Sequence, residues 1–360
     1  MDAYEQLREL LDASPTGAPA SPAFDKILKL LFTPEEAGLA IHLTLFPKPL
    51  VKIAADAGQD ANRAERLLDA MADKAVIFCM EKGQEKYYNL LPTIPGLFEF
   101  PLMNGTTNPT LEELGRLWDD YHREALGASF AGNPTPIVRV IPVEQSLDEN
   151  TRVHPYEEIY ALIEAADYIG LAQCACRVSI KACDKPTEVC LIFGTPARFL
   201  VKRGFAREIG RMEARAVLDR AEASGLVHTS TNSYGKPSFI CNCCPCCCTI
   251  LTCRTRLGLT QAFSPSAFEA RIDEETCTGC GVCTEERCPV KAIAINDFIA
   301  HVDTTACIGC GLCATACPPQ AITMVRRAQP CEVPLTTQEL GVKVLTEKGK
   351  LERYINQSNM

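Results

Sequence analysis

The sequence predicts an α+β fold built from several units, and three observations lead to this prediction. Helical apolar spacing alternates with short β-like segments over most of the 360 residues. One cysteine motif occurs twice near the C-terminal end, and a denser group of cysteines lies upstream of it. A chain of this length is long enough to hold two or three units, each with an apolar core.

The first segment, residues 1–22, is expected to form a helix followed by a linker. Tyr4, Leu7 and Leu11 follow helical spacing. Residues 12–22 are rich in proline, serine, glycine and alanine, which is the composition of a flexible linker. The first compact unit should therefore begin near residue 23.

Residues 23–103 contain the signals of several helices and a β-hairpin. Thr33 and Glu36 have the spacing of a capping box, with Pro34 at the first helical position. The expected elements are a helix after Thr33, helices at 49–58 and 62–71, and a hairpin over 76–88 that turns at Gly83. This order resembles the winged helix-turn-helix domains of MarR-like and related transcription factors. Cys79 lies in an apolar strand and is expected in the core.

The charge of this unit argues against DNA binding. A helix that reads DNA normally presents Arg, Lys, Asn or Gln to bases and phosphates. The helix at 62–71 offers Asn62, Arg63 and Arg66, but acidic residues lie among them. The whole chain has a formal net charge of −9. A structural or protein-docking role is therefore favoured for the winged-helix unit.

The middle region, residues 104–265, is expected to be a cysteine-rich α+β domain. Helices are predicted at 110–118, 155–166 and 209–224, and strands at 137–141, 226–229 and 238–240. Trp118 should anchor the packing of the first of these helices. The last helix and the last two strands have the order of a second helix-plus-hairpin unit.

Residues 277–318 contain an internal repeat with a period of thirty residues. The first copy holds Cys277, Cys280, Cys283 and Cys288, the second holds Cys307, Cys310, Cys313 and Cys317, and a proline follows each last cysteine. Three thiolates separated by two residues each can wrap a short loop around three corners of an iron–sulfur cube. The glycines at 279, 281, 309 and 311 allow the tight turns that this requires. Zinc sites of four cysteines also use C-x2-C pairs, but the C-x2-C-x2-C motif favours an iron–sulfur cube over a zinc ion.

The repeat resembles the bacterial two-cluster ferredoxins over residues 268–325. In that family the fourth cysteine of each run binds the other cluster. The resemblance implies one [4Fe–4S] cluster on Cys277, Cys280, Cys283 and Cys317, and a second on Cys307, Cys310, Cys313 and Cys288. The first copy departs from the family because four residues, not three, separate Cys283 from Cys288. We expect the extra residue to form a bulge beside one cluster, within a ferredoxin domain at 266–330. A tail at 331–360 follows, with a strand and a helix predicted between 333 and 353.

A second metal locus is predicted in the middle region. Its candidate ligands are Cys174, Cys176, Cys183, Cys190, Cys241, Cys243, Cys244, Cys246, Cys247, Cys248 and Cys253. Neighbouring residues of an extended chain point to opposite sides, so the run at 241–248 should face two sites at once. At least one further iron–sulfur cluster is favoured over zinc, because the ferredoxin repeat indicates which cofactor the chain carries. The sequence leaves the pairing of these cysteines open, and Arg177 and Lys181 are candidates either for contacts to the site or for solvated surface charge.

These patterns favour an electron-transfer protein with a redox partner. The acidic net charge favours a partner with a basic docking patch over nucleic acid. The polar start and the absence of a long apolar run predict a cytoplasmic protein with no membrane span, in an anaerobic cell. No phosphate-binding glycine loop or catalytic histidine pattern is present. Two alternatives stay open: a redox-sensing transcription regulator that uses the winged helix, and a reductase acting at a middle-domain cluster.

Overall fold

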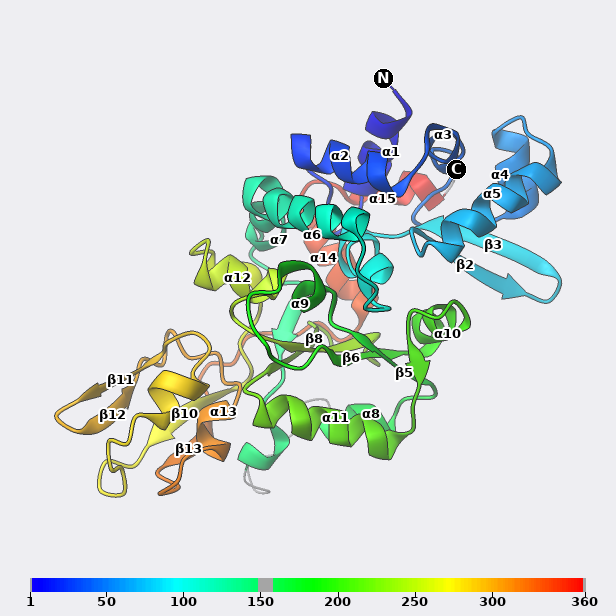
Figure 1. Cartoon of the computed structure of the whole chain (residues 1–360). Coiled ribbons are helices and arrows are strands. Elements are labelled where there is room, and N and C mark those ends of the chain that lie inside the picture. The colour runs from blue at the N-terminus through cyan, green and yellow to red at the C-terminus, as the bar shows by residue number, and fades with distance from the viewer. Residues whose placement is uncertain (1, 148–157, 359–360) are drawn as a thin grey trace.

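The computed structural model describes residues 2–147 and 158–358, which fold into helices and antiparallel sheets (Figure 1). An N-terminal unit, a middle unit around the largest sheet, and the cysteine repeat follow one another along the chain. The repeat lies at one end of the molecule, far from the N-terminal unit (Figure 1). The mixture of helices and strands agrees with the predicted α+β class.

The N-terminal unit places helices around a small sheet. Its elements are α1 (Ala3–Asp12), α2 (Pro22–Leu31), α3 (Pro34–Ala40), β1 (Lys48–Pro49), α4 (Leu50–Asp56), α5 (Ala61–Asp73), β2 (Ile77–Lys82) and β3 (Glu85–Leu90), and the strands pair antiparallel in the order β1-β3-β2. The predicted capping box is present, because Thr33 Oγ1 accepts from the Glu36 amide at 3.3 Å and the Glu36 carboxylate accepts from the Thr33 amide. Cys79 is buried in the core, as predicted.

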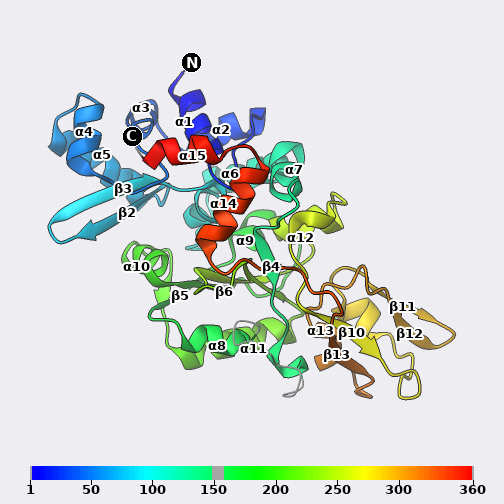
Figure 2. The same ribbon diagram turned by 180° about the vertical axis from the view of Figure 1, so that it is seen from behind.

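The predicted linker at 12–22 is packed rather than flexible. Ser14, Thr16 and Ala18 are buried. The C-terminal tail covers this segment with two helices, α14 (Thr337–Glu347) and α15 (Leu351–Ser358), which run back along the N-terminal unit (Figure 2). Lys350 Nζ lies 2.7 Å from Asp12 Oδ1, and Lys348 Nζ donates to the Pro15 carbonyl at 2.7 Å. The strand expected in the tail is absent from the described residues.

Several short helices connect the N-terminal unit to the middle unit. They are η1 (Thr93–Leu97), η2 (Phe100–Leu102), α6 (Pro109–Tyr121), η3 (His122–Leu126) and α7 (Gly127–Ala131). The cap of α6 is Asn108, whose side chain accepts from the Leu111 amide at 2.9 Å. Trp118 packs against the rings of Phe24 and Phe98, which confirms its predicted role as an anchor.

The middle unit is organised around a six-stranded antiparallel sheet. Its elements are β4 (Val138–Val140), η4 (Glu144–Ser146), α8 (Ile159–Glu164), β5 (Ile169–Gln173), α9 (Ala175–Ile180), β6 (Glu188–Phe193), α10 (Gly194–Lys202), β7 (Arg207–Glu208), α11 (Arg211–Ala223), β8 (Val227–Thr231), β9 (Phe239–Cys243), α12 (Thr249–Thr255) and η7 (Thr260–Ala262). The strand order is β4-β8-β9-β6-β5-β7. The predicted helix-plus-hairpin at 209–240 is therefore not a separate unit, because β8 and β9 are central strands of this sheet. The predicted helix at 155–166 is described from Ile159 onward, and its first residues lie outside the described part.

Apolar side chains of α8 and α11 cover one face of the sheet. Ile163 and Val217 pack into one buried cluster with Leu171 and Leu191 of the central strands. The opposite side of these strands faces α9, as Figure 1 shows. The middle cysteines therefore come from β6 and β9 of this sheet and from the segments around α9 and α12.

Candidate metal centres

The cysteine repeat forms two small sheets with matching loops. Its elements are β10 (Phe268–Ile272), η8 (Cys283–Arg287), β11 (Ile293–Asn296), β12 (Ile299–Val302), α13 (Leu312–Thr315) and β13 (Ile322–Arg326). Strand β10 pairs with β13, and β11 pairs with β12. Each cysteine loop begins in the same way, because the Cys277 amide donates to Asp273 at 3.0 Å and the Cys307 amide to Asp303 at 2.9 Å.

Two cavities lie within this repeat. The inner cavity is lined by Cys288, Cys307, Cys310 and Cys313. The outer cavity is lined by Cys277, Cys280, Cys283 and Cys317. Each cavity thus brings together three cysteines from one copy and the last cysteine from the other, which is the grouping that the ferredoxin resemblance implies.

Backbone geometry around both cavities fits an iron–sulfur cluster. Gly279 and Gly309 have φ of +62° and +67°, and a Cβ at either position would overlap a carbonyl oxygen, that of Phe298 or that of Phe268. Backbone amides also approach the sulfurs: Ala292 N donates to Cys288 Sγ at 3.1 Å. Such N–H donors stabilise the charge of cluster-bound thiolates.

The extra residue of the first copy forms the predicted bulge. The amide of Cys288 donates to the Cys283 carbonyl at 3.0 Å, which closes a five-residue turn at η8. In the second copy, Cys317 donates instead to Ala314, three residues back, after the shorter α13. Arg287, at the end of the bulge, donates to the carbonyls of Leu312, Glu222 and Ala223 at 3.0 to 3.1 Å. The bulge therefore attaches the repeat to the end of α11.

The two cavities differ in exposure. Cys310 and Cys313 are buried, and the Cys310 carbonyl accepts from the Val143 amide of the middle unit at 2.9 Å. Burial raises the pKa of the Cys310 thiol to about 12, so this thiol favours its protonated form until a metal displaces the proton. Cys280 is exposed. The inner cavity therefore lies beside the middle unit, whereas an exposed cysteine lines the outer cavity.

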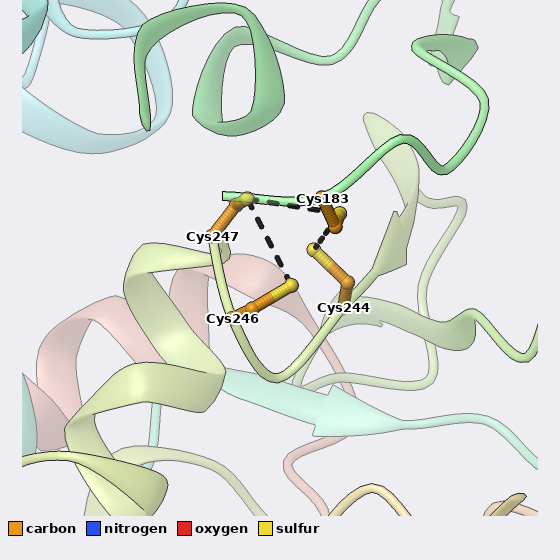
Figure 3. A group of neighbouring side chains, drawn as sticks. All are labelled: Cys183, Cys244, Cys246 and Cys247. Carbon is orange, nitrogen blue, oxygen red and sulfur yellow. Dashed lines mark hydrogen bonds between the residues drawn. The ribbon is translucent and has the colours of Figure 1, made fainter. Parts of the chain in front are cut away.

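Four of the middle cysteines form a compact four-thiol group. Its members are Cys183, Cys244, Cys246 and Cys247, whose sulfur atoms all lie within 4.8 Å of one another (Figure 3). Cys183 lies in the loop after α9, and the other three occupy the turn after β9. The neighbouring Cys247 thiol, and then the Arg177 guanidinium, lower the pKa of Cys244 to about 4. A thiolate is the form of cysteine that binds metals.

Six of the remaining seven middle cysteines form a six-thiol group beside it. Each thiol of the group interacts with the next one in the following order: Cys190, Cys241, Cys243, Cys248, Cys176 and Cys174. Cys241 and Cys243 share one face of β9, and Cys190 lies on the paired strand β6. Hydrogen bonding to a neighbouring thiol, and then burial, raises the pKa of Cys174. Once deprotonated, such a group of neighbouring thiols is a donor set that could hold a metal cluster.

The run at 241–248 therefore faces two groups, as its spacing predicted. Arg177 lies between them: it is buried, donates to the carbonyls of Asn242 at 2.9 Å and Pro186 at 2.8 Å, and faces Cys244. Of the two roles that the sequence left open for Arg177, the structure favours contact with the cysteine site over a solvated surface charge. Lys181 instead forms an exposed ion pair with Glu112 at 3.0 Å and is a surface charge.

The structure brings Cys253, the remaining predicted ligand, into neither group. It is buried, and its sulfur lies 3.8 Å from His122 Nε2 and donates to the Thr249 carbonyl at 3.4 Å. Cys253 lies five positions after Cys248, which turns its side chain by about 140° around α12, away from the other sulfurs. In this structure Cys253 is a buried thiol apart from both groups.

Comparison with known proteins supports the interpretation of the repeat. A family described as a 4Fe-4S dicluster domain matches residues 269–329. No curated protein matches the chain at a significant level. The chain therefore contains a ferredoxin-like iron–sulfur domain in its C-terminal part. Among the described residues, no helix has both the length and the apolar character needed to cross a membrane.

Proposed function

We propose that this chain is an electron-transfer protein that relays single electrons between a redox partner and a centre in its middle unit. The ligands would be those of the inner cavity (Cys288, Cys307, Cys310, Cys313), those of the outer cavity (Cys277, Cys280, Cys283, Cys317), and the six-thiol group for at least one additional cluster. Bound [4Fe–4S] clusters supply reversible one-electron chemistry. The protein residues position the clusters and limit their contact with water.

One observation carries this proposal: a single short helix joins the six-thiol group to the inner cavity. Helix α12 begins directly after Cys248, a member of the six-thiol group. Near its other end, Arg254 donates to the Ala306 carbonyl at 2.9 Å, beside Cys307. Seven residues of helix span about 10 Å. Because electron tunnelling falls steeply with distance, this short separation favours transfer between the two centres.

The outer cavity is the proposed point of exchange with a partner. Cys280 is exposed there, and Phe298 at the tip of the β11–β12 hairpin is 86% exposed. Exposed acidic side chains surround this end: Asp273, Glu274, Glu275, Glu285, Glu286 and Asp297. A partner protein with a basic surface would match this charge. All 21 cysteines are unpaired thiols, in keeping with the proposed location in the reducing cytoplasm of an anaerobic cell.

The N-terminal unit is assigned a winged-helix fold with a structural role. Two of its basic side chains pair with acidic neighbours: Arg63 with Glu35 at 2.6 Å, and Lys86 with Glu65 at 2.8 Å and Asp69 at 2.7 Å. Its hairpin also packs against the middle unit, where the ring centroids of Phe78 and Phe199 lie 4.6 Å apart. These contacts favour docking within the chain over contact with DNA phosphates.

The test is an electron-relay assay on the full chain purified without oxygen. Reduced methyl viologen is the donor and cytochrome c the acceptor, and EPR follows the clusters in samples frozen during turnover. We expect the protein to accelerate transfer catalytically while its cluster signals appear and disappear. Replacement of Arg254 by alanine should slow reduction of the middle centre more than reduction of the ferredoxin domain. Clusters that reduce but never pass electrons to the acceptor would contradict the proposal.

A further inference from the structure

We propose that the four-thiol group is a separate mononuclear zinc site. It would hold one ion through Cys183, Cys244, Cys246 and Cys247 and would not take part in electron transfer. The inference concerns a site outside the ferredoxin domain and outside the six-thiol group, and it stands whether or not the chain relays electrons.

The separations between the sulfur atoms match a single tetrahedral ion. Three of them are 3.9 Å: Cys183 to Cys244, Cys183 to Cys247, and Cys246 to Cys247. With zinc–sulfur bonds of about 2.3 Å, the sulfurs of a tetrahedral site lie about 3.8 Å apart. Figure 3 shows the four side chains directed toward one common point.

A four-iron cluster would hold its thiolates farther apart, because each binds a different iron and points outward from a corner of the cube. The ferredoxin cysteines fit this arrangement: each set of four lines its own cavity, and among the described residues neither set has all its sulfurs within 4.8 Å of one another. Three or more His, Cys, Asp or Glu side chains with all ligand atoms within 4.8 Å of one another occur, in the described part of the chain, at the four-thiol group. Three of its four ligands come from the four residues 244–247, which brings their sulfurs close without any room for a cube.

The location of the site gives the ion a structural task. Cys183 follows α9, which carries Cys176 and begins directly after Cys174. The other three ligands follow β9, which carries Cys241 and Cys243. An ion at the four-thiol group therefore fastens together the two segments that supply most of the six-thiol group. Zinc suits this task because it has no redox chemistry of its own and stabilises folded loops directly.

The experiment measures zinc in the full chain, expressed without oxygen in medium that contains both iron and zinc. We expect about one zinc per chain, and X-ray absorption at the zinc edge should show four sulfur neighbours at about 2.3 Å. Replacement of Cys246 by alanine should remove the zinc while the EPR signals of the ferredoxin clusters persist. Cys246→His should retain zinc, because zinc accepts three cysteines and one histidine. Cys331→Ala, in the exposed tail, is the matched control and should retain zinc.

The X-ray absorption spectrum of the unaltered protein tests the zinc assignment even if a variant fails to fold. Absence of zinc, iron in its place, or zinc with oxygen neighbours would overturn the assignment. Zinc retained after both Cys183→Ala and Cys246→Ala would also overturn it. These outcomes are distinct from a failure of the electron relay, which is read from cluster EPR and acceptor reduction.

Discussion

The two cysteine-rich regions of this molecule use the same side chain to build different kinds of site. In the ferredoxin domain, two residues separate the first three cysteines of each copy from one another, and the sulfurs line two cavities. At 241–248, cysteines are adjacent or separated by one residue, and the sulfurs of the four-thiol group approach to 3.9 Å. The spacing of cysteines along the chain therefore limits how far apart their sulfur atoms can lie. That separation in turn limits how many metal ions the sulfurs can enclose.

The exchange of ligands between the two repeat copies gives the largest expected effect. Cys317 belongs to the second copy but lines the outer cavity with Cys277. Cys317→Ala should remove about four irons per chain and leave the inner cluster. The matched variant, Cys288→Ala, should remove the inner cluster instead. A soluble paramagnetic relaxant distinguishes the two by EPR, because Cys280 is exposed and Cys310 is buried. Loss of the same cluster in both variants would show that the ligands are not exchanged.

A second pair of variants tests which cysteines of the middle region bind metal. Cys243→Ala should lower the iron content to about eight per chain, because Cys243 is central in the six-thiol group. Cys253→Ala is the matched control, since its thiol faces His122 within the core. We expect it to leave the iron content unchanged. Iron loss in the Cys253 variant, or none in the Cys243 variant, would reject this division of the cysteines.

The bulge of the first copy should contribute to the attachment of the ferredoxin domain. Arg287 donates to three carbonyls, two of them at the end of α11. Arg287→Ala should lower the free energy of unfolding by about 2 kcal/mol, because charged hydrogen bonds are lost at a partly exposed site. Denaturant unfolding under argon measures the change. Arg271→Ala, at an exposed arginine of β10, should have little effect. If both variants lowered the free energy of unfolding equally, the bulge would not contribute specifically to attachment of the domain.

Acid should weaken the sheet beneath the six-thiol group through His228. Burial lowers the pKa of His228 from 6.5 to about 4, although its Nδ1 donates to Asn242 Oδ1 at 2.6 Å. Between these values the unfolded chain binds more protons, so stability rises with pH in this window and is constant above it. From pH 7 to pH 5.5 the loss should be about 1 kcal/mol. Comparison of the chain with His228→Gln at each pH isolates this contribution. An equal slope in both proteins would contradict it.

The acidic end should contribute the smallest effect, on the rate of electron transfer to a basic acceptor. Glu275→Lys, near the outer cavity, should slow reduction of cytochrome c about threefold at low ionic strength. The difference should vanish in high salt, where exposed charges are screened. Asp25→Lys carries the same change of charge in α2, a helix that lies far from the cysteine repeat (Figure 1). If both variants slow the reaction equally, the acceptor does not dock at the outer cavity.

Local patterns were the part of this structure that the sequence predicted well. The capping box at Thr33, the bulge before Cys288 and the opposite facing of cysteines along β9 each depend on a few neighbouring residues. Their geometry follows from spacing alone. The grouping of the ferredoxin cysteines followed instead from a family resemblance, because the exchanged fourth ligand is a long-range contact.

The features that could not be predicted depend on distant packing. The hairpin at β8 and β9 joined a larger sheet because β4 and β6 supply partners for its two edges. The composition of residues 12–22 indicated a linker, yet the C-terminal helices bury it. Arg254 and Arg287 were missed as well, since a single arginine carries no local signal that it will dock one domain on another.

The most direct test of the central claim is a count of iron and acid-labile sulfide per chain, with EPR of the reduced protein, in material kept free of oxygen. The account predicts about twelve or more irons with matching sulfide, and signals that interact magnetically. A count of about eight would contradict a cluster in the six-thiol group. Colourless protein that carries zinc and lacks labile sulfide would contradict the assignment of the chain as an iron–sulfur electron carrier.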